Sequence, residues 1–355
     1  MRFMHIRAGW RRRAGVVGVV AAAGLALVGC ASNSGSGTGT DASSKGKPIV
    51  IGFSQAFSSN SWQTANNASA AAAIKALEAN KKVSGYKFLD ANNSPSTQIT
   101  QINDLILAHV SVILVDPTSS TALNGVIAKA IHAGIPVLVF SDGPVTSTLP
   151  YELEFPLKQY EVISAQYIAQ RLHGKGNVLD VRGVAGTGGD QTMQSGVVSG
   201  FQNYPGIKIV GTVYGEWAEA PTESKVAQLL PSLPRIDAVI QQGGEGYGVA
   251  QAFQAAGRPI PLIVMGNRTE ELQFWNNQHK KNGYTTLSLS ANPGIGASAV
   301  YVGYAIASGQ KVPKNMTFPN LQISQTTLGN FLNLPAGGVA SQSYSQAWTQ
   351  QNIIG

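Results

Sequence analysis

Short apolar runs alternate with helix-like stretches along most of this chain, from residue 49 to about residue 308. The runs are rich in Val and Ile, which is typical of strands buried on both faces of a parallel sheet. Between them, apolar residues recur at helical spacing, as Ala70, Ala73, Ile74 and Leu77 do, and this indicates helices with one buried face. The pattern predicts an α/β fold in which helices cover parallel sheets.

The alternation forms two series, separated by a turn-rich stretch at 142–150. In the first series we expect strands at 49–53, 86–89, 112–115 and 136–140. In the second series we expect strands at 177–181, 207–213, 238–240, 262–265 and 285–290. Ser96 is the expected N-cap of the helix after the second strand. Two such series predict two similar α/β lobes.

The loop after the first strand combines hydrogen-bonding side chains with aromatic rings. Ser54 and Asn60 supply the polar groups, and Phe57 and Trp62 supply the rings. In an open parallel sheet, ligands bind beyond the carboxyl ends of the strands. The mixture suits a sugar, which has hydroxyls on its rim and C–H groups on its faces. An ordinary strand–helix turn with a core tryptophan explains the loop equally well.

The first 30 residues have the features of a secretory signal. Arginines precede the apolar segment 14–28, which at 15 residues is short for a membrane span of about 20 residues. The segment ends in Leu-Val-Gly-Cys, which resembles the lipobox of bacterial lipoproteins. We expect a signal peptide at 1–29, then lipidated Cys30 and a flexible Ser/Gly/Thr-rich tether at 30–47. An ordinary signal with an incidental cysteine is the alternative.

Charge and composition narrow the class of protein. The formal net charge is +7, but without residues 1–29 the chain has 20 basic and 18 acidic side chains, a net of +2. This balance gives no support for nucleic-acid binding. A hydrophobic content of 43% and a length of 355 residues suit a globular protein of two domains. Cys30 is the only cysteine, so no intrachain disulfide can form.

Sequence signatures of enzymes are poor. The five histidines are scattered without the spacing of a metal site, and no Gly-x-Ser-x-Gly elbow is present. The glycine-rich run 243–248 lacks the full dinucleotide fingerprint. Asp142 and Glu154 would suit glycoside hydrolysis only if their carboxyl groups lie about 5–10 Å apart. We therefore expect a protein that is not an enzyme and that uses no cofactor or metal.

Six segments occur in the order found in one family of receptors. They are IVIGFSQ at 49–55, LDANNSP at 89–95, ILVDPTSSTAL at 113–123, AGIPVLVFSD at 133–142, RGVAGT at 182–187 and QGGEGYGVAQAFQAAGRPIP at 242–261. Through these segments the chain resembles the periplasmic sugar-binding proteins of the ribose-binding type, the solute receptors of ABC importers. The resemblance covers roughly residues 49–326.

The resemblance implies the type 1 periplasmic binding protein fold, two doubly wound parallel-sheet lobes joined by a three-crossing hinge. The crossings are expected near Glu154, Ser290 and Pro319. The implied divisions are an N-terminal lobe of 48–154 plus 291–319, a C-terminal lobe of 155–290 plus 320–335, and a polar tail at 336–355. In this family a sugar binds between the lobes, the hinge closes, and the closed form docks on the permease.

The resemblance also implies which side chains contact the sugar. Ser54 and Asn60 fall where the family has hydroxyl-binding groups, and Phe57 and Trp62 fall where it has aromatic rings. Asp142, or Ser141 if the loop is shifted by one residue, matches an aspartate after the fourth strand. In the second lobe and at the crossing, the corresponding residues are Trp217, Gln242, Asn267, and Ser290 or Asn292.

The chain departs from the family pattern at three places, one of which is the 151–156 stretch, where Glu152 and Glu154 replace residues that are usually neutral amides in relatives. Asn267 replaces an aspartate, and the arginine usual on the helix after the Val-Ala-Gly-Thr loop is missing, so Asp190 and Gln191 are candidates to replace it. Ordinary structural roles also remain open. Trp62 and Trp217 would suit a core, Asp142 a turn and Asn267 a helix cap.

These observations predict a lipid-anchored, monomeric receptor in the periplasm or on the outer face of the cytoplasmic membrane. It would bind a monosaccharide or polyol and deliver it to an ABC permease. A sensory receptor coupled to a membrane kinase or chemoreceptor is one alternative, and a secreted glycosidase-like enzyme is another. A transcription regulator of this fold is excluded, because a signal and a tether occupy the position of its DNA-binding headpiece.

Overall fold

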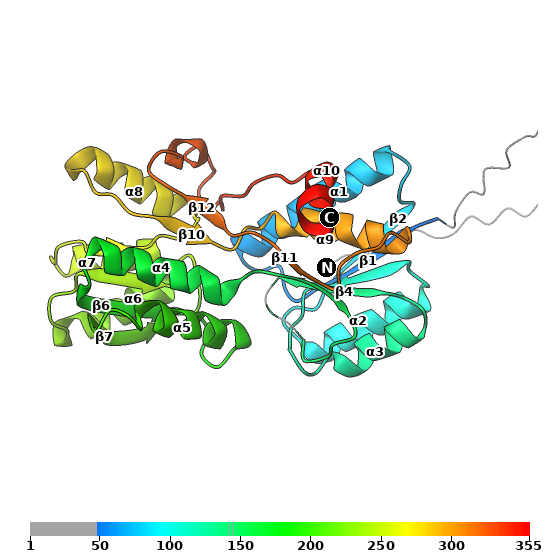
Figure 1. Ribbon diagram of the computed structural model, residues 1–355, viewed down its shortest axis with the longest axis horizontal. Coiled ribbons are helices and arrows are strands. Elements are labelled where there is room, and N and C mark those ends of the chain that lie inside the picture. Colours follow the sequence, from blue (N-terminus) through cyan, green and yellow to red (C-terminus); the bar gives the residue numbers. More distant parts are fainter. Residues whose placement is uncertain (1–47, 142, 144) are drawn as a thin grey trace, which may run out of the picture. The chain divides into compact units, whose positions relative to one another are not determined.

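The computed structural model describes residues 48–141, 143 and 145–355 (Figure 1). The predicted signal peptide, Cys30, the tether and Asp142 lie outside the described residues. The described residues belong to one compact unit, Lys47–Gly355. Within the described part, none of the helices combines the length and the apolar character needed to cross a membrane.

The first sheet has six strands in the order β11-β5-β4-β3-β1-β2, and all neighbouring pairs are parallel. The strands are β1 (Val50–Gln55), β2 (Gly85–Asp90), β3 (Val112–Val115), β4 (Val137–Ser141), β5 (Tyr151–Glu154) and β11 (Asn315–Thr317). Four of them match the strands expected in the first series. The sequence pattern missed β5 and β11, which are short and pair with each other at one edge of the sheet.

Helices cover both faces of this sheet. They are α1 (Ser61–Ala79) and α9 (Ile295–Ala307) on one face, and α2 (Pro95–Leu107) and α3 (Asn124–His132) on the other. The residues of β3 alternate between the two resulting cores: Val112 and Leu114 join one, and Ile113 and Val115 join the other. Burial on both faces explains why this strand is continuously apolar.

The predicted N-cap of α2 is wrong by two residues. Ser94 Oγ accepts a hydrogen bond from the Thr97 backbone N–H at 3.2 Å, and Pro95 begins the helix. Proline suits the first helical position, because its missing N–H would have no partner within the helix there. Ser96 therefore lies inside the first turn.

The second sheet has four parallel strands in the order β7-β6-β8-β9. The strands are β6 (Lys175–Arg182), β7 (Gly206–Tyr214), β8 (Ala238–Gln241) and β9 (Leu262–Ile263). The helices of this lobe are α4 (Leu157–Arg171), α5 (Gly188–Phe201), α6 (Glu219–Leu229), α7 (Gly246–Ala255) and α8 (Thr269–Asn282), with a 3₁₀ turn at Leu230–Ser232. The helix α4 packs on α5, and α6 packs on α7.

A two-stranded antiparallel sheet extends this lobe. It pairs β10 (Ser288–Ser290) with β12 (Leu321–Ile323), and a parallel bridge from Met265 to Ser288 joins it to the strand region of β9. A 3₁₀ turn at Leu328–Phe331 follows β12. Leu321 and Ile323 share an apolar cluster with Trp275 of α8.

Before residue 336, the chain passes between the first sheet and the second lobe at three places. The first passage, at 155–156, lies between β5 and α4; the second, at 291–294, lies between β10 and α9; the third, at 318–320, lies between β11 and β12. These three stretches are called the crossings below.

The segment 336–355, expected to be a polar tail, is packed into the fold. It forms α10 (Gln346–Thr349) and a short π-helix at Gln350–Ile354. Ile353 and Ile354 are buried in the same core as α1 and α9, and Figure 1 shows α10 beside α9. Polar residues outnumber apolar ones in the tail, and the large apolar side chains of Tyr344, Ile353 and Ile354 face the core.

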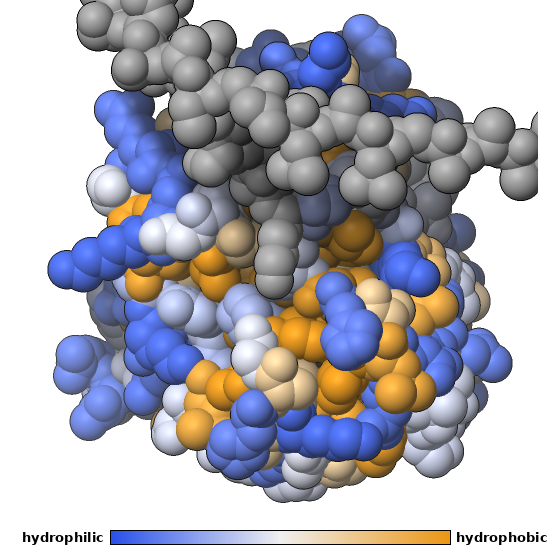
Figure 2. All heavy atoms as spheres, turned by 90° about the vertical axis from the view of Figure 1, so that its right-hand side faces the viewer, coloured by the Kyte–Doolittle hydropathy of each residue, from blue (hydrophilic) through white to orange (hydrophobic). Residues whose placement is uncertain are grey.

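The first lobe also exposes some large apolar side chains. Phe88 on the edge strand β2 is 38% exposed, and Leu107 at the end of α2 is 75% exposed. Figure 2, which views the end of the molecule toward which β2 lies in Figure 1, shows apolar surface interrupted by polar side chains.

Candidate functional site

A buried polar network closes the strand ends of the first lobe. Gln55, the last residue of β1, donates from Nε2 to Gln63 Oε1 at 2.5 Å and to Asp116 Oδ2 at 2.7 Å. Gln63 Nε2 donates to the same carboxylate oxygen at 3.1 Å. All three side chains are buried, so the two charge-assisted bonds to Asp116 form away from water and hold the loop firmly.

Gln98 of α2 ties a second loop to this network. Its Nε2 donates to the carbonyl of Asp116 at 2.7 Å, and its Oε1 accepts from the backbone N–H and the hydroxyl of Thr118, each at 2.8 Å. The sequence reading did not select Gln55, Gln63, Gln98 or Asp116. What could have revealed them is that they are polar residues at strand ends and on helix faces that the pattern predicts to be buried.

The predicted residues of the first loop have different positions. Ser54 is fully buried, and its hydroxyl donates to Gln101 Oε1 at 3.2 Å, so it lies beneath the loop. Asn60 Oδ1 accepts from the Gln63 backbone N–H at 2.8 Å and caps α1. Phe57 is half-buried, and its carbonyl accepts a hydrogen bond from Gln55.

Trp62 connects this loop to the second crossing. Its indole Nε1 donates to the carbonyl of Ala291 at 3.0 Å. Its ring centroid lies 6.2 Å from that of Phe155 in the first crossing. The side chain is half-buried, so Trp62 packs against two crossings while part of its ring stays exposed.

In the second lobe, Arg182 and Asp190 form a bidentate ion pair. Arg182 Nε donates to Asp190 Oδ1 at 2.8 Å, and Nη2 donates to Oδ2 at 2.7 Å. The guanidinium carbon lies 5.0 Å from the centroid of the Tyr214 ring, within cation–π distance. The hydrogen bonds to Asp190 raise the pKa of Arg182.

This ion pair supplies a guanidinium near the place where the family usually has an arginine on α5. No arginine occurs on the first turns of α5, but Arg182 at the end of β6 brings a guanidinium to the same strand end. Asp190 is 1% exposed and orients that guanidinium. Gln191, the other proposed replacement, is exposed on α5.

Gln242 links two loops of the second lobe. Its Oε1 accepts from the Gly183 backbone N–H at 2.8 Å, and its Nε2 donates to the carbonyl of Asp190 at 3.2 Å. The side chain is buried. Both ends of the amide are therefore used to position the loop after β6.

Trp217 lies in the loop after β7, in a left-handed backbone conformation with φ of 52°. Its carbonyl accepts a hydrogen bond from Arg268 Nη2 at 2.9 Å, and the side chain is half-buried. The guanidinium lies so close to Gly244 that a Cβ there would be 2.2 Å from Arg268 Nε. Arg268, which the sequence reading did not select, therefore joins the loops after β7 and β8.

The residues predicted at the second crossing are also buried. Ser290 Oγ has no hydrogen-bond partner among the described residues. Asn292 Nδ2 donates to the hydroxyl of Tyr344 at 2.7 Å, and its Oδ1 accepts from the Gly294 backbone N–H at 3.0 Å. The amide of Asn292 is thus engaged by the protein itself.

Asn267 does not cap α8, which was one of its two expected roles. The cap position is Arg268, whose backbone N–H donates to Glu271 Oε2 at 3.1 Å. Asn267 Nδ2 instead donates to the carbonyl of Ala340 at 2.8 Å. The contact links the start of α8 to the C-terminal segment.

Several carboxyl groups are buried within the second lobe. They are Glu161 of α4, Asp180 of β6, Glu245 before α7 and Glu271 of α8. Loss of water raises the pKa of each, and that of Asp180 rises to about 6. Backbone N–H groups of Gly246 and Gly266 oppose the rise at Glu271. Burial thus favours the protonated forms of these acids.

These acids do not form a metal site. Within 48–141, 143 and 145–355, no cluster of His, Cys, Asp and Glu side chains could hold a metal ion. Asp142, one of the two carboxylates considered for glycoside hydrolysis, lies outside the described residues.

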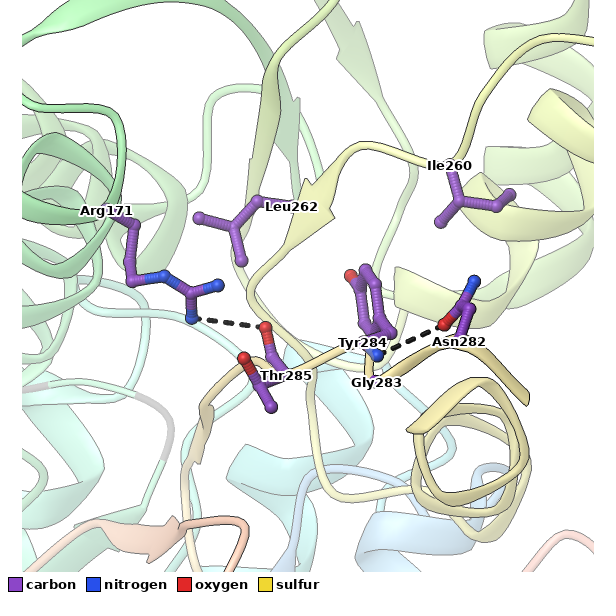
Figure 3. Close-up of a pocket in the computed structure, with 7 residues that line it drawn as sticks. All are labelled: Arg171, Ile260, Leu262, Asn282, Gly283, Tyr284 and Thr285. Carbon is purple, nitrogen blue, oxygen red and sulfur yellow. Dashed lines mark hydrogen bonds between the residues drawn. The ribbon is translucent and has the colours of Figure 1, made fainter. Parts of the chain in front are cut away.

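A shallow pocket of about 350 Å³ lies elsewhere in the second lobe (Figure 3). It adjoins the start of β9, where Arg171 Nη1 donates to the carbonyl of Thr285 at 3.1 Å. The other lining residues are Ile260, Leu262, Asn282, Gly283 and Tyr284. None of the predicted site residues lines this pocket, so we do not assign the candidate site to it.

Two parallel α/β sheets, with polar and aromatic side chains at their carboxyl ends, define a receptor of the type 1 periplasmic binding protein fold. The chain belongs to the periplasmic binding protein family, since the model of the periplasmic binding protein domain matches residues 51–311. Within it the chain is of the ribose-binding type, among the solute-binding proteins of ABC transporters. The family consists of binding proteins and not of enzymes, as the sequence predicted.

Three similar proteins place the chain within this family. The solute binding protein of an ABC transporter from Thermobispora bispora is 31% identical, with a TM-score of 0.77 over 86% of this chain and 94% of that one. The xylitol-binding protein of Mycolicibacterium smegmatis is 28% identical over 62% of this chain and 63% of its own length. The ribose import binding protein of Bacillus subtilis is 25% identical over 73% of this chain and 84% of its own length.

Proposed function

We propose that this protein captures a monosaccharide or related polyol between its two lobes and delivers it to the membrane subunits of an ABC importer. The observation that carries the proposal is the arrangement of the second-lobe strand ends. There an aromatic ring, Trp217, and an oriented guanidinium, Arg182, follow adjacent strands. A ring suits the C–H face of a sugar, and fixed donors suit its hydroxyls.

The first lobe would supply the opposing contacts. Phe57 and Trp62 are half-buried and would offer aromatic surface, and Asp142 would accept hydroxyl hydrogen bonds. Ser54, Asn60 and Asn292 already have protein partners, and their role would be to hold the loops. The names of similar proteins, which refer to xylitol and ribose, support the polyol or sugar class.

We further propose that the mature chain is a monomer anchored through acylated Cys30, at the outer face of the cytoplasmic membrane or in the periplasm. The support is the basic start, the apolar segment and the Leu-Val-Gly-Cys sequence at 27–30. Mass spectrometry of protein extracted from membranes should show acyl chains on Cys30. An unmodified thiol in that protein would contradict the anchor and leave the solute-binding proposal standing.

Thermal unfolding with a panel of pentoses, hexoses and polyols tests the main proposal. A solute present at 100 times its Kd should stabilise the protein by about 2.7 kcal/mol, and calorimetry should then give a one-to-one stoichiometry. Arg182→Gln should weaken that binding, whereas Lys208→Gln, on the exposed part of edge strand β7, should not. A panel in which no sugar or polyol stabilises the protein would contradict the proposal.

A further inference from the structure

The C-terminal segment is fastened to the second lobe. Val339 pairs with Arg268 in an antiparallel bridge at the start of α8. The Ala340 backbone N–H donates to the carbonyl of Asn267, and Asn267 Nδ2 donates back to the carbonyl of Ala340, each at 2.8 Å. Ala340 is fully buried in the cluster that contains Trp275. The segment is therefore anchored by both hydrogen bonds and apolar packing.

A few residues later the same segment is fastened to the first lobe. Tyr344, Ile353 and Ile354 are buried in the core formed with α1 and α9. The hydroxyls of Ser298 and Thr349 share a buried hydrogen bond of 2.9 Å. This anchor places the last turns of the chain against α9, as Figure 1 shows.

Between the two anchors, the segment lies directly on the second crossing. Asn292 Oδ1 accepts from Ser341 Oγ at 3.2 Å and from the Gln342 backbone N–H at 3.4 Å, and its Nδ2 donates to Tyr344. A Cβ at Gly294 would come within 2.4 Å of the Gln342 carbonyl oxygen. The approach is so close that the crossing requires glycine at this position.

A row of aromatic rings connects the segment to the other two crossings. Phe318 of the third crossing lies 4.9 Å from Tyr344, 6.0 Å from Trp348 and 5.8 Å from Phe155 of the first crossing, measured between ring centroids. Phe155 in turn contacts Trp62. The C-terminal segment therefore contacts the second crossing through the amide of Asn292 and the third crossing through Phe318. Phe318 in turn connects it to the first crossing.

Hinge motion in a two-lobe protein is absorbed by φ/ψ changes in a few connecting residues. Here only Ser341, Gln342 and Ser343 separate the anchors, and extended chain spans at most about 3.6 Å per residue. We propose that residues 339–354 form a strap that limits how far the two lobes can open. The strap would raise the fraction of molecules ready to close on a solute, and apparent affinity scales with that fraction. This effect on affinity rests on the proposed function; the limit on opening does not.

Lengthening the strap tests the proposal without any ligand. Four residues, Gly-Ser-Gly-Ser, are inserted between the exposed Gln342 and Ser343, so that both anchors remain. Spin labels at Lys75→Cys in α1 and Ala227→Cys in α6, both exposed, report the distance between the lobes by double electron–electron resonance. Cys30→Ser removes the only native thiol. The insertion should broaden the distance distribution and extend it to longer distances.

The matched control places the same insertion between the exposed Gln310 and Lys311, in the loop from α9 to β11 within the first lobe. It should leave the distribution unchanged. Tyr344→Phe, which keeps the ring and removes the hydroxyl bonded to Asn292, should shift the distribution in the same direction by less. Identical distributions for the parent and the lengthened strap, in proteins with native circular dichroism, would overturn the strap and leave the solute-binding proposal intact.

Discussion

The indole ring of Trp217 lies directly on the backbone of Gly183: a Cβ atom at Gly183 would be 2.0 Å from Trp217 Cε2. The two residues follow the adjacent strands β6 and β7. Arg268 holds the backbone of Trp217 by a hydrogen bond to its carbonyl. The ring is therefore fixed from two sides at the strand ends where we propose that the solute binds.

Gly183→Ala should displace the Trp217 ring, because no methyl group fits at 2.0 Å from an aromatic carbon. Overpacking of this kind costs about 1–3 kcal/mol of stability. We expect solute affinity to fall by at least about tenfold, which corresponds to about 1.4 kcal/mol. Calorimetry with a stabilising sugar or polyol measures the affinity, and tryptophan fluorescence reports the displacement.

Gly188→Ala is the matched control, since it adds the same methyl group at the start of α5, where no atom outside its chain neighbours and its own helix backbone lies within 4 Å. Its affinity and fluorescence should equal those of the parent protein. Unchanged affinity in Gly183→Ala, together with a changed fluorescence spectrum, would show that the Trp217 ring does not contact the solute.

The Arg182–Asp190 ion pair should contribute more to stability than the exposed Lys225–Glu216 ion pair. Arg182→Ala leaves the carboxylate of Asp190, which is 1% exposed, without its partner, and such changes cost about 3–5 kcal/mol. The Lys225–Glu216 pair has exposed fractions of 39% and 52%. Lys225→Ala should therefore cost about 0–1 kcal/mol. Urea unfolding of both variants measures the difference, and equal losses would contradict this ranking.

The buried acids should make stability decrease as pH rises through the weakly acidic range. The pKa of Asp180 is about 6 in the folded protein, against a usual value of 3.8. Between these values the folded state keeps a proton that the unfolded state has lost, so stability falls with pH. The two-unit difference corresponds to about 3 kcal/mol for this group. Glu161, with its pKa also raised, should extend the decline to higher pH.

Asp180→Asn removes the titrating group and keeps the shape of the side chain. Urea unfolding from pH 4 to pH 8 should show a smaller decrease for this variant than for the parent protein. Well above pH 6, Asp180 is ionised in both the folded and the unfolded state, so its own proton no longer contributes to the pH slope. The same pH slope for parent and variant throughout the range would contradict the assignment of the proton to Asp180.

Local sequence patterns were sufficient for most of the fold. The continuous apolar run at 112–115 predicted a strand buried on both faces, and Val112 and Ile113 do enter opposite cores. Six segments in family order predicted the type 1 periplasmic binding protein fold, and the comparisons confirm it. Such patterns succeed because helix and strand periodicities arise from neighbours a few residues apart.

Local patterns were weaker for the candidate site. Position along the chain placed Trp217 and Asp190 at strand ends, but Arg182 was missed because its partnership with Asp190 and Tyr214 is visible only in three dimensions. The resemblance implies Ser290 or Asn292 as a solute contact, and in the structure the amide of Asn292 bonds Tyr344. The ligand-binding residues as a set stay a prediction.

The sequence by itself determined the two lobes, the helices that cover them and the family, since these follow from short-range periodicity and ordered motifs. Only the tertiary structure decided what Trp62 and the C-terminal segment do. Trp62 bonds Ala291, 229 residues away, and Tyr344 bonds Asn292, 52 residues away. Contacts over such separations depend on how the packed lobes bring the crossings together, and a local hydrophobic pattern does not predict this packing.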